Sequence, residues 1–191
     1  MEAWFTCLNQ IIPLNDELTA RLLRCMTLER HLKNKALLKQ TDAGDWMAFV
    51  ESGTLEMAIE NSEGKEQILR FYQTGDMLFP AAWWKPLSNR AISLFTLTET
   101  TLRKIRKTEL LLLCSKFPDF YEHYIHFLLN EYLHLVKYNF LQIEPARVKL
   151  TMLKQDFTSL FENRAIKDYH LASYCGMDKV TFSRLRGGAA K

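Results

Sequence analysis

Glycine and proline are scarce in this sequence, at seven and five residues among 191. This scarcity excludes collagen-like repeats, and with 48% hydrophobic residues it also excludes a chain that stays disordered. The longest apolar candidate, "LLLLC" at 110–114, falls well short of the roughly 18 residues that a membrane span needs. The N-terminus lacks the basic and apolar segments of a secretory signal. We therefore expect a cytoplasmic protein with no membrane partner.

Cysteine is also rare, and no two cysteines form a CxxC pair, so neither a zinc site nor an iron–sulfur cluster is indicated. We interpret the four cysteines as reduced and mostly buried. His123 and His126 are three residues apart on an expected helix and could share a metal, but no carboxylate pattern accompanies them. No metal site is predicted. The four cysteines are Cys7, Cys25, Cys114 and Cys175.

Motifs of catalysis are missing as well. The chain contains no GxSxG, no phosphate-binding GKS or GKT loop and no HExxH. "DAGDW" and "SEGKE" place carboxylates beside glycine, but turns between strands explain both segments. We expect no catalytic residues and no enzyme activity.

The positive charges are concentrated at the C-terminal end. After Glu144 there are nine basic and four acidic residues, a net charge of +5. The preceding residues hold 16 basic and 18 acidic side chains, a net charge of −2. This asymmetry is expected if only the C-terminal part meets a polyanion such as DNA.

The spacing of apolar residues divides the chain into helical and β regions. Residues 1–30 have a helical period, with Asn15 or Asp16 as a candidate helix cap. From about 31 to 106, short alternating runs are separated by turn residues, among them "NSEG" at 61–64, which joins two strands. Gly53, Gly64 and Gly75 mark three successive turns. Many short strands at this spacing predict a β-sandwich, barrel or roll.

A long helix is expected within residues 117–145, with Pro118 in its first turn and Pro145 at its end or opening the next helix. It carries two apolar stripes at the spacing of coiled-coil seams. We expect one stripe to cover the chain's own β-domain and the other to pair with the same helix of a second subunit. A buried helix of a larger monomer is the alternative. The first stripe is Tyr121, Ile125, Leu128, Tyr132 and Leu135. The second stripe is Leu129, Leu133, Val136, Phe140 and Ile143.

Three shorter helices are expected at about 146–161, 166–173 and 178–187. The segment "LASYCGMDKVTFSRLR" has the pattern of a helix-turn-helix: Ala172 permits a close helix crossing, and Gly176 permits the turn. The expected small core consists of Ile166, Leu171, Ala172, Val180, Phe182 and Leu185.

This order of elements resembles the Crp/Fnr superfamily of bacterial transcription regulators. The resemblance is carried by "ESGTLEMAIENSEGKEQILRFYQTGDMLF" and by the helix-turn-helix segment. It implies an α+β fold: a β-roll of the cyclic-nucleotide-binding type with flanking helices over 1–116, a dimerisation helix over 117–144 and a DNA-binding helix-turn-helix over 145–191. Many members continue into a β-hairpin wing, whereas this sequence ends at "RGGAAK"; a short form and a truncated chain both explain this.

In this family the second helix of the motif enters the major groove. By resemblance, Lys179, Val180 and Arg184 match the base-reading positions. Thr181 and Ser183 are candidate phosphate contacts, and Arg186 completes the expected DNA-binding set. The resemblance implies a homodimer on an inverted-repeat operator, with RNA polymerase as a further candidate partner. A β-roll sensor that binds no DNA is the alternative function.

The effector pocket departs from that of nucleotide-binding members. Phe79 and Pro80 stand where these members carry a Gly-Glu pair, and Ala91 stands where they carry a hydroxyl beside the phosphate-binding arginine, here Arg90. A lone arginine compensates a desolvated phosphodiester poorly. The pocket is therefore vestigial, or takes an unidentified apolar or aromatic effector, or binds a nucleotide in altered geometry, and we expect no usual response to cyclic AMP. Its remaining candidate residues are Trp83, Leu135 and Val136.

Overall fold

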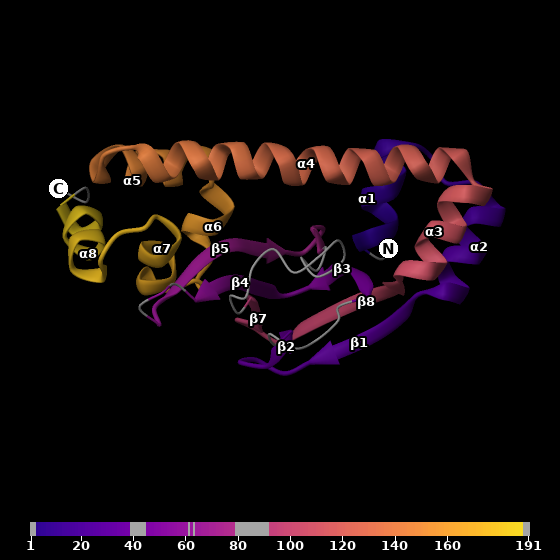
Figure 1. Cartoon of the computed structure of the whole chain (residues 1–191), viewed down its shortest axis with the longest axis horizontal. Coiled ribbons are helices and arrows are strands. Elements are labelled where there is room, and N and C mark those ends of the chain that lie inside the picture. The colour runs from indigo at the N-terminus through magenta and orange to yellow at the C-terminus, as the bar shows by residue number, and fades with distance from the viewer. Residues whose placement is uncertain (1–2, 39–44, 61, 63, 79–91, 189–191) are drawn as a thin grey trace.

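The structure is a computed structural model that describes residues 3–38, 45–60, 62, 64–78 and 92–188. A long helix, α4 (Pro118–Ile143), extends along one side of the molecule. The β-strands lie below its middle, the N-terminal helices lie at one end, and the C-terminal helices lie at the other (Figure 1). The expected α+β architecture is confirmed.

The N-terminal segment forms two helices, α1 (Ala3–Ile11) and α2 (Asp16–Cys25). Asn15 caps α2, since its side chain accepts a hydrogen bond of 2.8 Å from the backbone N–H of Leu18. Leu18 and Leu22 are buried, as their spacing predicts. Helical structure ends at Cys25, earlier than expected, because the next residues already pair as a strand.

Within the described residues, eight strands form two antiparallel four-stranded sheets, in the orders β1-β8-β3-β6 and β2-β7-β4-β5. An apolar cluster that includes Val50, Leu55, Leu94 and Leu102 draws on both sheets and closes the β-roll. The strands are β1 (Thr27–His31), β2 (Ala36–Leu38), β3 (Trp46–Ser52), β4 (Thr54–Glu60), β5 (Glu66–Gln73), β6 (Met77–Leu78), β7 (Ile92–Thr96) and β8 (Thr100–Arg106).

The three glycines predicted at turns all have positive φ. Gly53 joins β3 to β4 at φ +102°, and a Cβ there would lie 2.6 Å from the carbonyl oxygen of Glu99. Because that neighbour is backbone, only glycine fits at this turn. Gly64 lies in the β4–β5 connection, which confirms the predicted hairpin.

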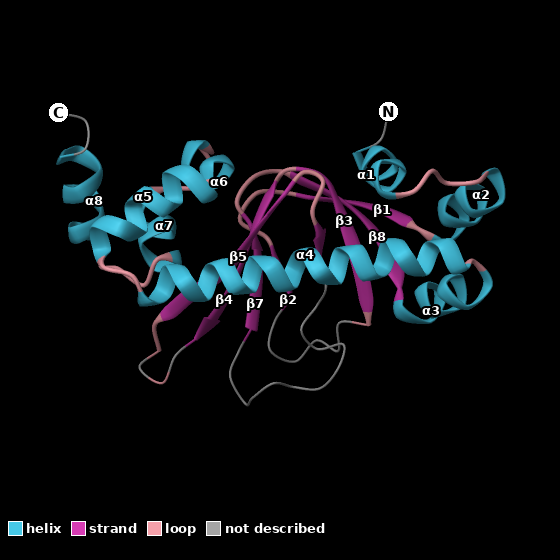
Figure 2. Cartoon of the chain, turned by 90° about the horizontal axis from the view of Figure 1, so that it is seen from above, coloured by secondary structure: helices cyan, strands magenta, loops and turns pink. Residues whose placement is uncertain are grey.

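Helix α3 (Lys107–Lys116) precedes α4, and Phe117 separates the two. Pro118 occupies the first turn of α4, as predicted. Backbone N–H groups in the first turn have no acceptor within the helix, so proline, which lacks an N–H, costs no hydrogen bond there. Figure 2 shows α4 passing across both sheets, from α3 at one end to the C-terminal helices at the other. The helix contributes buried side chains to one core with α1, α2 and α3 and to a second core in the C-terminal region.

The prediction that one apolar stripe of α4 covers the chain's own β-domain is wrong. Every member of the first stripe is exposed, and so is every member of the second except the half-buried Val136. At about 100° per residue, the two stripes share one half of the helix surface. The opposite half faces the protein, with the Phe127 ring centroid 5.4 Å from that of Phe49. Its buried residues are Phe120, His123, Phe127, Tyr138 and Leu141.

The C-terminal region contains four helices rather than three: α5 (Ala146–Asp156), α6 (Thr158–Glu162), α7 (Asp168–Tyr174) and α8 (Lys179–Gly188). The single helix expected at 146–161 is interrupted at Phe157, whose buried ring joins the core. Among the described residues, no helix is long and apolar enough to cross a membrane.

Candidate nucleic-acid interface

Helix α8 has one buried face and one exposed face. Phe182 is fully buried, and Leu185 packs in the same apolar cluster as Leu171 of α7. Burial of these side chains fixes the rotation of α8 about its own axis. Four of the six predicted DNA contacts therefore share the outward face. They are Lys179, Val180, Ser183 and Arg184.

The assignment of Val180 to the small core is wrong, because its side chain is 60% exposed. Val180 lies two residues before Phe182, which places it about 160° away around the helix. Burial of Phe182 thus turns Val180 outward. The other residues expected in this core are buried or packed against it.

The remaining two predicted contacts have partners within the protein. Thr181 is half-buried, and its backbone N–H donates a 2.9 Å hydrogen bond to the carboxylate of Asp178, which caps α8. Hydrogen bonds from Thr181 lower the pKa of Asp178. Arg186 forms an ion pair with Asp168 of α7, and its guanidinium carbon lies 4.6 Å from the ring centroid of Phe161. Arg186 therefore ties α8 to α6 and α7.

Side chains of α4 and α5 hold the turn between α7 and α8 in place. Gly176 has φ +63°, as the sequence predicts for this turn. Gln142, near the end of α4, donates a 2.8 Å hydrogen bond to the carbonyl of Tyr174. Buried Lys149 of α5 donates one of 2.8 Å to the carbonyl of Cys175. These two side chains satisfy carbonyls at the end of α7.

Helix α7 also packs directly on strand β5. The Ser173 hydroxyl accepts a 3.1 Å hydrogen bond from the backbone N–H of Ile68 and lies 3.1 Å from the carbonyl oxygen of Glu66, to which it donates. Nearby, Asn163 donates a 3.1 Å bond to the Thr54 hydroxyl. The helix-turn-helix is thus joined to the β-roll by hydrogen bonds as well as by apolar packing.

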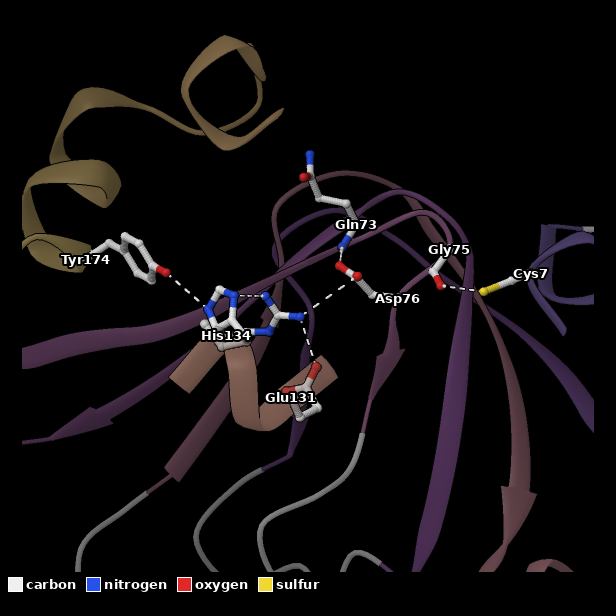
Figure 3. Close-up of polar contacts among 8 residues, drawn as sticks. Cys7, Gln73, Gly75, Asp76, Glu131, His134 and Tyr174 are labelled. Atoms are coloured by element: carbon white, nitrogen blue, oxygen red, sulfur yellow. Dashed lines mark hydrogen bonds and ion pairs between the residues drawn. The ribbon is translucent and has the colours of Figure 1, made fainter. Parts of the chain in front are cut away.

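A group of half-buried polar side chains connects β5, α4 and the buried Tyr174 of α7 (Figure 3). Arg70 of β5 forms a 2.9 Å ion pair with Glu131 and lies 3.9 Å from Asp76. Arg70 also donates to Nδ1 of His134, whose Nε2 lies 3.1 Å from the hydroxyl of Tyr174 in α7. We call these five residues the Arg70 cluster.

The partners of His134 fix its tautomer. Arginine can only donate, so Nδ1 of His134 must accept, and the proton then resides on Nε2 and is donated to the Tyr174 oxygen. Burial, with Arg70 and Lys137 nearby, lowers the pKa of His134 to about 3. The imidazole is therefore neutral at physiological pH. No sequence motif pointed to this cluster, because its members come from three separate segments of the chain.

Comparisons with known proteins agree with this arrangement. Residues 28–117 match the family model of the cyclic nucleotide-binding domain. A cyclic nucleotide-binding domain containing protein from Listeria monocytogenes superposes with a TM-score of 0.75 at 15% identity, covering 99% of this chain and 91% of its own. A structure from Eubacterium rectale, described as a regulator of the crp/fnr family, superposes with a TM-score of 0.71 at 14% identity, covering 99% and 88%.

This chain has the Crp/Fnr fold. The c-di-GMP responsive global regulator CLP of Xanthomonas campestris shares it, with a TM-score of 0.68 at 15% identity over 92% of each chain. No curated protein sequence matches the chain. The resemblance inferred from the sequence is confirmed at the level of the fold.

The candidate effector pocket of this Crp/Fnr fold is described only in part. Five of its predicted residues lie outside the described residues: Phe79, Pro80, Trp83, Arg90 and Ala91. Leu135 is exposed and Val136 is half-buried, both on the outward half of α4. Asp76 of the Arg70 cluster lies directly before β6, the strand that leads into the predicted pocket segment.

His123 and His126, considered above as two residues that could share a metal, have different surroundings. The His123 ring is buried 6.1 Å from that of Phe120, centroid to centroid, whereas His126 is exposed. Across the described part of the chain, no group of three or more His, Cys, Asp or Glu side chains could hold a metal ion.

Proposed function

We propose that the protein is a dimeric transcription regulator that binds DNA through α8. The observation that carries this proposal is the outward face of α8, where Lys179, Val180, Ser183 and Arg184 lie exposed. A helix that buries one face in a helix-turn-helix and presents cations on the other fits the major groove of DNA. The net charge of +5 after Glu144 supports the same partner.

Each exposed residue has a distinct role in this proposal. Arg184 and Lys179 donate to the O6 and N7 acceptors of guanine, and Val180 contacts a thymine methyl group. The Ser183 hydroxyl donates to a phosphate. Thr181 and Arg186 hold α8 in place rather than contact bases, because both have partners inside the protein.

The remaining parts serve this DNA-binding function. The outward half of α4, with both apolar stripes, pairs with its counterpart in a second subunit, since so long an exposed apolar face is unfavourable in water. We assign residues 1–116 to an effector-responsive β-roll, 117–144 to the dimerisation helix and 145–191 to the DNA-binding part. Two recognition helices about 34 Å apart would read an inverted repeat with half-sites about 10 base pairs apart.

One observation favours a second function, a β-roll sensor that binds no DNA. Helix α7 docks on the β-roll of its own chain through Ser173, and the Arg70 cluster reinforces this contact. In that case the helix-turn-helix would serve only to cover strand β5.

Binding isotherms on mixed-sequence DNA at several salt concentrations distinguish the two functions. We expect the logarithm of the binding constant to fall linearly with the logarithm of the salt concentration, because cations on the protein displace counterions from DNA. Once an operator is selected from a random pool, Arg184→Ala should weaken operator binding by about 1–3 kcal/mol per contact, and random DNA far less. Arg30→Ala, on exposed β1, is the matched control. Absence of DNA binding even at low salt would support the sensor instead.

A further inference from the structure

Helix α5 carries a polar stripe on its exposed surface. Arg147, Thr151 and Lys154 lie four and three residues apart, which places them on one face of the helix. All three side chains are exposed. The opposite face of α5 is buried through Lys149 and Leu153. The stripe is therefore held in a fixed direction by the core beneath it.

This stripe forms one wall of a groove of about 560 Å³ between α5 and α8. Arg184 of α8 lies on the other wall, so the groove opens beside the outward face that carries the predicted base-reading residues. The described residues that line the groove include three cationic side chains and no carboxylate. They are Arg147, Leu150, Thr151, Lys154, Arg184, Leu185 and Gly188.

The cations of this region fall into two groups. Lys149 and Arg186 have partners in the protein, a backbone carbonyl and the carboxylate of Asp168. Arg147, Lys154 and Arg184 form no ion pair with any described residue. The Lys154 ammonium only lies 5.6 Å from the ring centroid of Phe161. Three like charges along one groove repel one another until an anion neutralises them.

We propose that this groove binds the sugar-phosphate backbone of DNA beside the major groove that α8 enters. The inference rests on the proposed function and adds α5 to the interface. The cations come from two helices along an open groove, which suits successive phosphates of a strand better than one small anion. Arg184 lies at the junction, so base reading and backbone binding are continuous. These α5 contacts add affinity without sequence preference.

The test compares two double variants. Arg147→Ala with Lys154→Ala removes the α5 cations, whereas Arg24→Ala with Lys116→Ala removes the same charge from exposed sites on α2 and α3, at the far end of the molecule (Figure 1). Binding to a mixed-sequence duplex is measured over a range of salt. We expect the salt slope of the α5 variant to fall by about 0.9 for each phosphate that α5 no longer neutralises, or up to about 3.6 for a dimer. The control should keep the wild-type slope, and both variants should keep the wild-type melting temperature.

Three results would overturn the proposal. A slope equal to that of the control would show that α5 does not contact DNA, while leaving DNA binding by α8 intact. Inorganic phosphate could raise the melting temperature of the wild type but not that of the α5 variant, while the two proteins have the same salt slope. That result would assign the groove to a small anion. A wild-type protein that binds no DNA would remove the proposed function as well.

Discussion

Lys149 and Cys175 are joined by a buried hydrogen bond of 2.8 Å, from the ammonium group of α5 to the backbone carbonyl at the end of α7. The carbonyl end of a helix carries partial negative charge, so it is a suitable partner for a cation removed from water. Gly176 follows directly and turns the chain toward α8. The position of the candidate recognition helix thus depends on a lysine in a different helix.

Lys149→Met should destabilise the protein by about 1–3 kcal/mol, because the Cys175 carbonyl would remain buried without its donor. Urea unfolding would measure the loss. Lys154→Met, on the exposed side of the same helix, is the control and should change stability by no more than about 0.5 kcal/mol. Equal effects of the two substitutions would show that the buried hydrogen bond contributes nothing specific.

Leu128→Glu combined with Leu135→Glu should convert a dimer into monomers on a sizing column. The two side chains are 41% and 53% exposed in the single chain, so the charges should leave the monomer folded. In a helix–helix interface the same carboxylates would be desolvated and mutually repelling. Asn130→Glu with Lys137→Glu, also on exposed positions of α4 but outside both stripes, should elute as the wild type does. A dimer that survives the leucine substitutions would place the interface elsewhere.

Tyr174→Phe should weaken the contact between α7 and the β-roll. The substitution leaves the Nε2 proton of the half-buried His134 without its acceptor, which should cost about 1 kcal/mol. Amide hydrogen exchange would measure local opening of α7, which should become more frequent in the variant. The free energy of unfolding of the whole protein should fall as well. Tyr169→Phe serves as the control because Tyr169 is exposed. Unchanged exchange in Tyr174→Phe would rule out a role for the Arg70 cluster in this contact.

Glu56 should make the protein less stable as the pH rises. Burial, together with the charge of Glu66, raises the pKa of Glu56 to about 7 from an ordinary value of 4.5. The native state therefore holds its proton more tightly than the unfolded state, and stability is lost as the pH rises from about 4.5 to 7. His170 lies 3.8 Å away, and Lys33 and Lys167 line the same cavity.

Glu56→Gln should remove this pH dependence. Near pH 8 the variant should be more stable than the wild type by at most about 3 kcal/mol, and below pH 4 the two should agree. Urea unfolding over this pH range provides the measurement, with the exposed Glu99→Gln as control. A difference between wild type and Glu56→Gln that does not vary with pH would mean that folding leaves the pKa of Glu56 unchanged.

Millimolar cyclic AMP should leave the melting temperature unchanged. A ligand that binds only the native state stabilises it by about 2.7 kcal/mol at 100 times its dissociation constant. By the family resemblance, Phe79 and Pro80 stand where nucleotide-binding members carry a Gly-Glu pair, so we expect no such gain. An upward shift of several degrees would establish that the loop binds the nucleotide.

The sequence predicted most clearly what depends on neighbouring residues. Asn15 at a helix start, Pro118 in a first turn and Gly176 between two helices each act through local backbone geometry, and all three are found where expected. Which face of α4 packs against the protein could not be predicted from neighbouring residues. Its two stripes have ordinary seam spacing, yet the inward face instead contains aromatic rings such as Phe127 and Tyr138, together with polar side chains.

Charged side chains with partners inside the protein were the least predictable feature of the candidate site. Lys149 and Arg186 look like any other basic residue of the C-terminal part until their partners, Cys175 and Asp168, are placed beside them in space. The same limit applies to Arg70, whose two partners in α4 lie 61 and 64 residues away. Partners so distant in the chain leave no periodic pattern in the sequence.

The place of the Arg70 cluster along α4 has a mechanical consequence. The first half of the helix packs in an apolar core with α1, α2 and α3, and the last turns pack in a second core with α7 and α8. Glu131 and His134 lie between the two cores, so polar contacts hold the helix near its middle and any tilt would pivot there. Ile143 lies about 14 Å beyond His134 along the helix axis. A tilt of about 5° at His134 would therefore shift the C-terminal end of α4 by about 1 Å. Arg70 of strand β5 and Asp76 of the β5–β6 turn therefore fix the point on α4 about which such a tilt would occur.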